Sequence, residues 1–163
     1  MHVGHFYFLT DQYGSDFPNA GIMTNKPTVD GVKHGRPCFY SFEDSKTGLF
    51  WMIPVSSQIS KYQAIYQSKI SKYKTCDTIV FGNLLGQKSA FLIQNICPVT
   101  QKYINNEYLD KNNTPVRIPQ PLEKELQTKA RKVIALVRKG IHGLVFTDIL
   151  EIEKELLKEI NPI

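Results

Sequence analysis

The chain of 163 residues lacks the short motifs with which most enzymes hold nucleotides or metals. It contains no GxxxxGK[ST] phosphate loop, no GxGxxG fingerprint, no HExxH and no paired-cysteine zinc pattern. Its histidines show no metal-ligand spacing; they are His2, His5, His34 and His142. These absences disfavour a nucleotide-driven or metal-dependent enzyme, and we expect neither a metal nor another cofactor.

Long hydrophobic runs are also absent. No apolar run approaches the roughly 18 residues that a membrane span needs, and residues 1–10 do not resemble a secretory signal. The three cysteines, Cys38, Cys76 and Cys97, are widely spaced and odd in number, so they cannot all pair within the chain. We expect a cytoplasmic protein with no membrane partner, whose reduced cysteines serve as small core residues.

Acidic residues are missing from one long stretch. Between Asp44 and Asp77 there is no aspartate or glutamate, while the chain as a whole carries a net charge of +5. The same stretch holds five lysines: Lys46, Lys61, Lys69, Lys72 and Lys74. A one-sided basic segment indicates a polyanionic partner such as a nucleic acid. The alternative is an ordinary lysine-rich helix face in contact with solvent.

Short apolar runs predict an antiparallel sheet. The runs at 36–43 and 49–55 flank a turn and are expected to pair as a hairpin. Residues 11–33 are rich in turn formers and are expected to form a long loop. The expected strands cover 5–9, 36–43, 49–55, 78–82 and 89–96, with a short extended piece at 116–118.

Apolar residues at helical spacing occur between the expected strands and again in the last third of the chain. Ser60 is the expected N-cap of the first helix, and Asp148, with Glu151 three residues on, is expected to cap the last. The expected helices cover 61–74, 100–108 and 121–140, with a last one after Asp148. Residues 1–163 are therefore expected to form a single domain of the α+β class.

Chemically versatile side chains gather at the two ends of the expected hairpin. If its strands pair antiparallel, the residues before the first strand lie beside those after the second. The residues concerned are Lys33, His34, Arg36, Ser56, Ser57 and Lys61. Such a set suits metal-independent RNA cleavage, in which the ribose 2′-hydroxyl attacks the adjacent phosphate. A histidine can act as acid or base at neutral pH, and arginine, lysine and hydroxyl groups can stabilise the charged phosphate.

Each of these residues also has an ordinary structural interpretation. His34 could be a loop residue, Arg36 could pair with a nearby carboxylate, and a serine after a strand is most often a helix cap. Tyr7 and Tyr13 could stack on bases or bond phosphate, but a place in the core is at least as good an interpretation.

Three segments resemble the type III toxin–antitoxin endoribonucleases, the ToxN, AbiQ and CptN group. They are KHGRPCFYSFED at 33–44, FWMIPVSSQISKY at 50–62, and FGNLLGQKSAFLIQNICPVTQKYI at 81–104, the last being most similar to the CptN branch. More loosely, Arg36-Pro37 and Pro54-Val55-Ser56-Ser57 resemble elements of the MazF and Kid toxins.

The resemblance implies a compact, strongly bent antiparallel β-barrel with surrounding helices. It implies a toxin that cleaves cellular RNA and its own repeat antitoxin precursor to 2′,3′-cyclic phosphate and 5′-hydroxyl ends. The implied partner is a tandem-repeat pseudoknot RNA, which inhibits the toxin in a closed toxin–RNA hetero-oligomer. The resemblance also implies a part in phage defence by abortive infection.

The resemblance also assigns roles to residues. Ser56 and Ser57 match the active-site hydroxyl pair, Lys33 or His34 matches a basic residue before the first hairpin strand, and Tyr7 matches an aromatic near the site. Gln58 and Ile59 stand where some relatives have lysine, so Lys61 is the nearest lysine. Together with the basic segment, the expected RNA contacts are Tyr7, Tyr13, Lys61, Lys69, Lys72 and Lys74.

Two other functions stay open at this point. The same fold could hold RNA without cutting it, or a toxin of related shape could act on a protein target such as a DNA topoisomerase. The acid-free basic segment favours RNA over a protein, and His34 beside Arg36 and the serine pair favours cleavage over binding alone.

Overall fold

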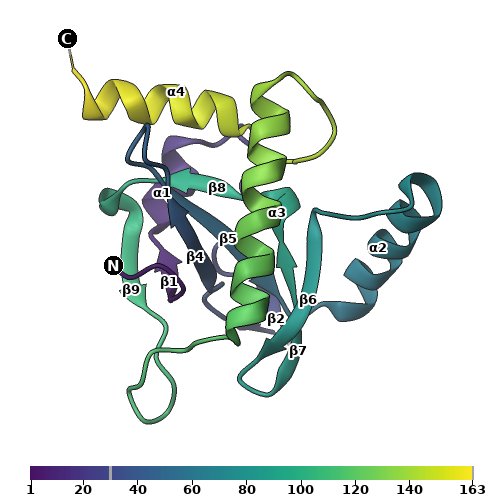
Figure 1. Ribbon diagram of the computed structural model, residues 1–163. Helices are drawn as coiled ribbons and strands as arrows, with labels where there is room; N and C mark the ends of the chain where they lie inside the picture. Colours follow the sequence, from purple (N-terminus) through teal and green to yellow (C-terminus); the bar gives the residue numbers. More distant parts are fainter. Residues whose placement is uncertain (30, 163) are drawn as a thin grey trace.

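The computed structural model describes residues 1–29 and 31–162, without the side chains of Val29, Val32 and Lys33 (Figure 1). Its strands are β1 (Phe6–Leu9), β2 (Thr28–Val29), β3 (Val32–Lys33), β4 (Cys38–Glu43), β5 (Phe50–Ser56), β6 (Ile79–Leu84), β7 (Gln87–Leu92), β8 (Cys97–Val99) and β9 (Ile104–Glu107). Its helices are α1 (Asp11–Asp16), α2 (Ile59–Tyr73), α3 (Gln120–Arg138) and α4 (Ile149–Ile160), with 3-10 turns η1 (Ile93–Asn95) and η2 (Gln101–Tyr103). This arrangement confirms the α+β class.

The main sheet is antiparallel and strongly bent. Its order is β6-β7-β5-β4-β1-β9, and β8 pairs with the first half of β5. The second half of β5 pairs instead with β7, so β5 changes neighbours along its length. A barrel would need its two edge strands to pair. Within the described residues β6 pairs only with β7 and the four-residue β9 only with β1. The expected closed barrel is therefore wrong.

Alternation along the central strands divides the core between the two faces of the sheet. In β5, Trp51, Ile53 and Val55 face one cluster of buried side chains, whereas Met52 faces another. This is the two-residue period of a strand buried on both sides. The pairing of β4 with β5 confirms the expected hairpin, with Phe39 opposite Ile53.

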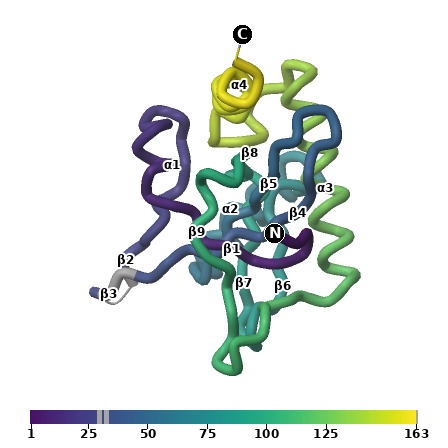
Figure 2. Tube along the Cα trace, turned by 90° about the vertical axis from the view of Figure 1, so that its left-hand side faces the viewer, coloured from purple at the N-terminus to yellow at the C-terminus, as the bar shows by residue number. Residues whose placement is uncertain are grey.

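Helices cover the faces that this alternation creates. The long helix α3 crosses one face of the sheet (Figure 1), and α1 lies on the opposite side of the molecule from α3 (Figure 2). Leu126, Ala130 and Val133 of α3 join the cluster around Trp51, while Tyr13 of α1 joins the cluster around Met52. The carboxylate of Asp148 caps α4 by accepting from the Glu151 N–H over 3.2 Å, which confirms the expected cap.

Three local expectations are wrong. Residues 11–33 contain helix α1 and the small β2–β3 hairpin, because Tyr13 anchors α1 by burying its ring and donating to the Pro98 carbonyl over 2.7 Å. Residues 100–108 form η2 and β9, because β1 offers β9 an unpaired edge. Helix α2 begins at Ile59 without a side-chain cap, so Ser60 lies inside it.

The three cysteines are free and buried, as the sequence predicts. Among the described residues, no helix combines the length and the apolar character needed to cross a membrane.

Candidate functional site

Strand pairing brings the residues before β4 and the residues at the end of β5 to one rim of the sheet. Cys38, at the start of β4, lies opposite Pro54 of β5, and the Val55 N–H donates to the Pro37 carbonyl over 3.0 Å. On the other side of β5, Ser56 pairs with Ala90 of β7. The segment before β4 and the residues that end β5 are therefore neighbours in space.

A hollow of about 470 Å³ opens at this rim, and we call it the rim cleft. Four of the residues predicted from the sequence line it together: His34, Arg36, Ser56 and Ser57. The opposite wall comes from the β6–β7 hairpin, through Leu84, Leu85 and Gln87. Hollows of this size are typical of sites for small molecules or for part of a larger ligand.

Arg36 is the most constrained of the four residues. Its side chain is almost buried, its Nε donates to the Thr24 carbonyl over 2.9 Å, and its Nη1 donates to the Val55 carbonyl over 3.0 Å. Burial lowers its pKa from the ordinary value, but a guanidinium stays charged in proteins. These two bonds leave other guanidinium N–H groups for an anion in the cleft. Within the described residues Arg36 makes no ion pair with Glu43 or Asp44, so that structural interpretation fails.

The two serines differ in their surroundings. Ser56 is nearly buried, and its Oγ accepts from the Gln58 N–H over 3.2 Å. Ser57 is exposed, and its hydroxyl makes no hydrogen bond within the described part of the chain. Ser57 therefore offers a hydroxyl that can turn toward a ligand in the cleft.

His34 is exposed and lies between the β2–β3 hairpin and β4. Its backbone N–H donates to the Pro27 carbonyl over 3.1 Å, while its ring bonds to no other described residue. The next residue is Gly35, where any Cβ would come within 2.9 Å of the Phe8 ring, so the backbone packs closely against that ring. The backbone is thus held while the imidazole is exposed and makes no hydrogen bond to another described residue.

The remaining predicted residues lie elsewhere. The side chain of Lys33 is outside the described residues. Tyr7 is nearly buried, does not line the rim cleft, and its hydroxyl accepts from the His2 N–H over 2.8 Å. Tyr13 is buried to 1% exposure and bonded to Pro98, and burial raises its pKa well above the ordinary value. These positions favour the core interpretation of both tyrosines over base stacking.

The lysines of the basic segment are not equivalent. Lys61 is exposed near the start of α2, and Lys72 and Lys74 are exposed at its far end, roughly 20 Å along the helix axis. Lys69 is half-buried, and its Nζ donates to the Thr78 hydroxyl over 2.7 Å and to Gln94 Oε1 over 3.2 Å. Lys69 therefore joins α2 to the sheet, which differs from the predicted phosphate contact.

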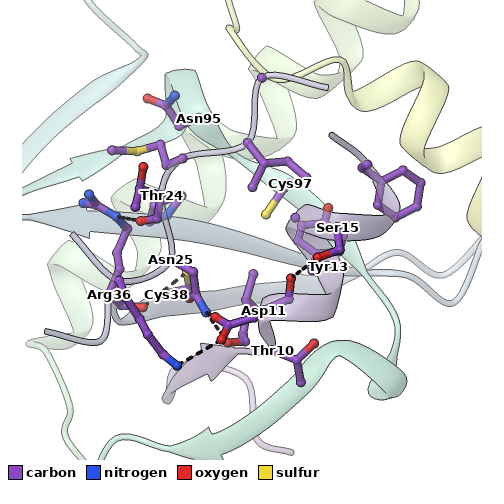
Figure 3. Close-up of a pocket in the computed structure, with 18 of the residues that line it drawn as sticks. Thr10, Asp11, Tyr13, Ser15, Thr24, Asn25, Arg36, Cys38, Asn95 and Cys97 are labelled. Atoms are coloured by element: carbon purple, nitrogen blue, oxygen red, sulfur yellow. Dashed lines mark hydrogen bonds and ion pairs between the residues drawn. The ribbon is translucent and has the colours of Figure 1, made fainter. Parts of the chain in front are cut away.

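Two further hollows adjoin the rim cleft, and Arg36 lines all three. The α2 hollow, of about 590 Å³, shares Arg36, Ser56 and Gln58 with the rim cleft and also includes Lys61. The α1 hollow, of about 530 Å³, lies beside Tyr13 and contains the buried thiols of Cys38 and Cys97 (Figure 3). The three hollows therefore have the side chain of Arg36 in common.

The rim cleft and the α2 hollow carry charge of one sign. Among the described residues that line them, the basic residues are His34, Arg36 and Lys61, and none is an aspartate or glutamate. The described residues also contain no group of three or more histidine, cysteine or acidic side chains arranged to hold a metal ion. A phosphate group fits such an environment.

Sequence reasoning missed the residues that long-range pairing adds to the site. The β6–β7 hairpin reaches the rim cleft only because β7 pairs with the end of β5. Gln94 and Phe146, which line the α2 hollow, lie far from the hairpin in sequence and carry no local signal. The two-residue turn at Leu85-Gly86 has positive φ at both positions, and Gly86 is the residue of this turn whose type favours such a backbone.

Comparison with models of known protein families and with curated proteins finds no match to this chain.

Proposed function

We propose that this protein is a metal-independent endoribonuclease that cuts RNA in the rim cleft. The observation that carries the proposal is the meeting of His34, Arg36, Ser56 and Ser57 around one hollow whose described lining holds no carboxylate. RNA supplies its own nucleophile, so such a site needs proton transfer and charge stabilisation but no covalent enzyme intermediate.

The proposed reaction is a transesterification. A base removes the proton from the 2′-hydroxyl, the 2′-oxygen attacks the adjacent phosphorus, and the bond from phosphorus to the 5′-oxygen breaks. An acid protonates the departing 5′-oxygen, which leaves a 2′,3′-cyclic phosphate and a 5′-hydroxyl. The exposed imidazole of His34 serves one of the two proton transfers, while Ser57 and the remaining N–H groups of Arg36 donate to the phosphate oxygens.

We further propose that the protein is the toxin of a type III toxin–antitoxin system that acts in the cytoplasm. Support comes from the resemblance of residues 33–44, 50–62 and 81–104, and from the lysines exposed on α2. Its partner in this proposal is a tandem-repeat pseudoknot RNA, which the toxin cuts from a precursor and then binds in a closed assembly. The two short motifs that resemble MazF and Kid are neighbours in space, since the Val55 N–H donates to the Pro37 carbonyl, and this adjacency is consistent with the proposal.

The test is incubation of the purified protein with a transcript of the DNA upstream of its gene, in EDTA. We expect cleavage at repeat boundaries and fragments that end in a 2′,3′-cyclic phosphate and begin with a 5′-hydroxyl. A 2′-O-methyl version of the same RNA is the control and should stay intact, since it lacks the attacking group. Intact RNA in both samples, or fragments with 3′-hydroxyl and 5′-phosphate ends, would contradict the proposal.

The surrounding DNA gives an independent check. Short tandem repeats directly upstream of the gene would support an RNA antitoxin. A small neighbouring gene for an acidic protein would instead support a toxin with a protein antitoxin, and would count against the RNA-inhibited system.

A further inference from the structure

Phe146 is the most exposed large apolar side chain of the described residues. It is 67% exposed, and its ring has no aromatic or cation partner among the described residues. It lies on the connection between α3 and α4 and lines the α2 hollow, together with Lys61 and Gln94. Phe146 thus places an exposed aromatic ring beside a basic side chain and an amide at the wall of one hollow, a combination suited to binding a nucleotide.

The backbone holds Phe146 firmly in this exposed position. Its N–H donates to the Gln94 carbonyl over 2.8 Å, and the Asp148 N–H two residues later donates to the Ala20 carbonyl over 2.8 Å. Gly21 has a φ of +70°, and a Cβ there would come within 2.4 Å of the Phe146 carbonyl oxygen. The backbone of Phe146 is therefore fixed by contacts with two other segments of the chain.

Gln94 contributes an oriented donor to the same hollow. Its side chain is only 3% exposed, and its Oε1 accepts from Lys69 Nζ over 3.2 Å. Because an ammonium group only donates, this contact fixes which end of the amide is the oxygen. The Nε2 group bonds to no other described residue, so a nearly buried amide keeps two N–H donors for a ligand in the hollow.

We propose that the α2 hollow binds one unpaired nucleotide of the RNA whose neighbouring phosphate occupies the rim cleft. The base stacks on Phe146, an acceptor on the base or ribose meets Nε2 of Gln94, and Lys61 contacts a phosphate. Lys69 is a positioning residue that orients the Gln94 amide. This subsite rests on the proposed ribonuclease function, and it extends the bound segment beyond the scissile bond.

Three features select a nucleotide as the occupant. An aromatic ring stacks on any base, an amide donor reads an acceptor at the base edge, and a lysine attracts the backbone phosphate. The hollow shares Arg36, Ser56 and Gln58 with the rim cleft, so one strand can occupy both. The described lining holds no carboxylate that would repel the phosphates.

The test measures the affinity of a labelled 2′-O-methyl oligoribonucleotide of random sequence, which cannot be cut, for the wild type and three variants. Loss of base stacking in Phe146→Ala should weaken binding about five- to one-hundredfold. Phe146→Trp should keep the affinity, and its indole emission should be quenched when the oligonucleotide binds. Leu150→Ala, which removes another exposed apolar side chain, is the matched control and should bind within about twofold of the wild type.

The outcomes separate this proposal from the proposed function. If the wild type binds and cuts RNA but Phe146→Ala binds as tightly as the wild type, the subsite is wrong and the ribonuclease stands. If the wild type binds the oligonucleotide but cuts no RNA, and Phe146→Ala weakens binding, the subsite stands and the nuclease function falls. If the wild type neither binds nor cuts, both proposals fall.

Discussion

The guanidinium of Arg36 donates to the carbonyl of Val55 over 3.0 Å and so ties the residues before β4 to the end of β5. A second bond, to the Thr24 carbonyl, attaches the same side chain to the segment after α1. Arg36 is only 8% exposed, so its side chain is packed into the protein as well as lining the rim cleft. A residue that sequence reasoning assigned to phosphate recognition thus also holds the site together.

The first prediction concerns this double role. Arg36→Lys should lower the free energy of unfolding by about 1–3 kcal/mol, because an ammonium group cannot reproduce two bonds made by a planar fork and leaves a buried carbonyl unpaired. Urea denaturation measures the change. Arg117→Lys, at an exposed arginine that pairs with Glu123, is the control and should change stability by less than about 0.5 kcal/mol. Equal free energies of unfolding for Arg36→Lys and the wild type would show that the two carbonyl contacts do not stabilise the fold.

The second prediction uses a buried ion pair beside the β4–β5 turn. Asp44 is 7% exposed and accepts from Arg138 over 2.8 Å and from the Lys46 N–H over 2.9 Å. Burial acts to raise the pKa of Asp44, but the bonds from Arg138 and Lys46 outweigh it and hold this pKa below the ordinary value. A carboxylate with a depressed pKa in the folded state stabilises the fold above its unfolded pKa, and this stabilisation is lost as the pH falls through the folded pKa.

Asp44→Asn removes the charge while keeping an oxygen for the turn. The variant should be less stable than the wild type at pH 7, and the difference should shrink as the pH falls below about 4. Thermal unfolding across that range measures the effect. Glu43→Gln, at the exposed neighbouring position, should show a small difference from the wild type at every pH. A difference for Asp44→Asn that does not change with pH would exclude the ion pair as its cause.

The third prediction separates the lysines of α2. If Lys72 contacts a phosphate, Lys72→Ala should make the dependence of log affinity on log salt concentration less steep by about 0.7–0.9. Lys69→Met should weaken binding without changing this slope, because Lys69 acts by orienting Gln94. Affinity for the uncut 2′-O-methyl RNA, measured from low to high salt, gives both slopes. If Lys69→Met also made the salt dependence of the affinity less steep, Lys69 would contact a phosphate, as the sequence predicts.

Local patterns predicted the hairpin and the residues at its rim. The apolar runs at 36–43 and 49–55 and the turn between them predict the hairpin, and antiparallel pairing then brings His34 and Arg36 beside Ser56 and Ser57. The α+β class and the Asp148 cap followed from similarly local signals. These features depend on near neighbours in the chain, which is why sequence alone suffices for them.

Features set by distant pairing could not be predicted in this way. Whether β6 and β9 close a barrel depends on contacts between strands at least 20 residues apart. The burial of Tyr13 depends on the carbonyl of Pro98, and the role of Lys69 depends on Gln94. The acid-free stretch predicted Lys69 as an RNA contact, and only the packing of α2 against the sheet shows that it is half-buried and that burial lowers its pKa.

The most direct measurement is the single-turnover rate of RNA cleavage by His34→Ala and Ser57→Ala, with affinity for the uncut 2′-O-methyl RNA measured in parallel. If the rim cleft is the reactive centre, cleavage by His34→Ala should fall about 10²–10⁴-fold and cleavage by Ser57→Ala about 10²–10³-fold, while both variants bind RNA within about threefold of the wild type. His142→Ala, at another exposed histidine, should cut at the wild-type rate. Undiminished cleavage by both His34→Ala and Ser57→Ala would contradict the assignment and place the chemistry elsewhere on the protein.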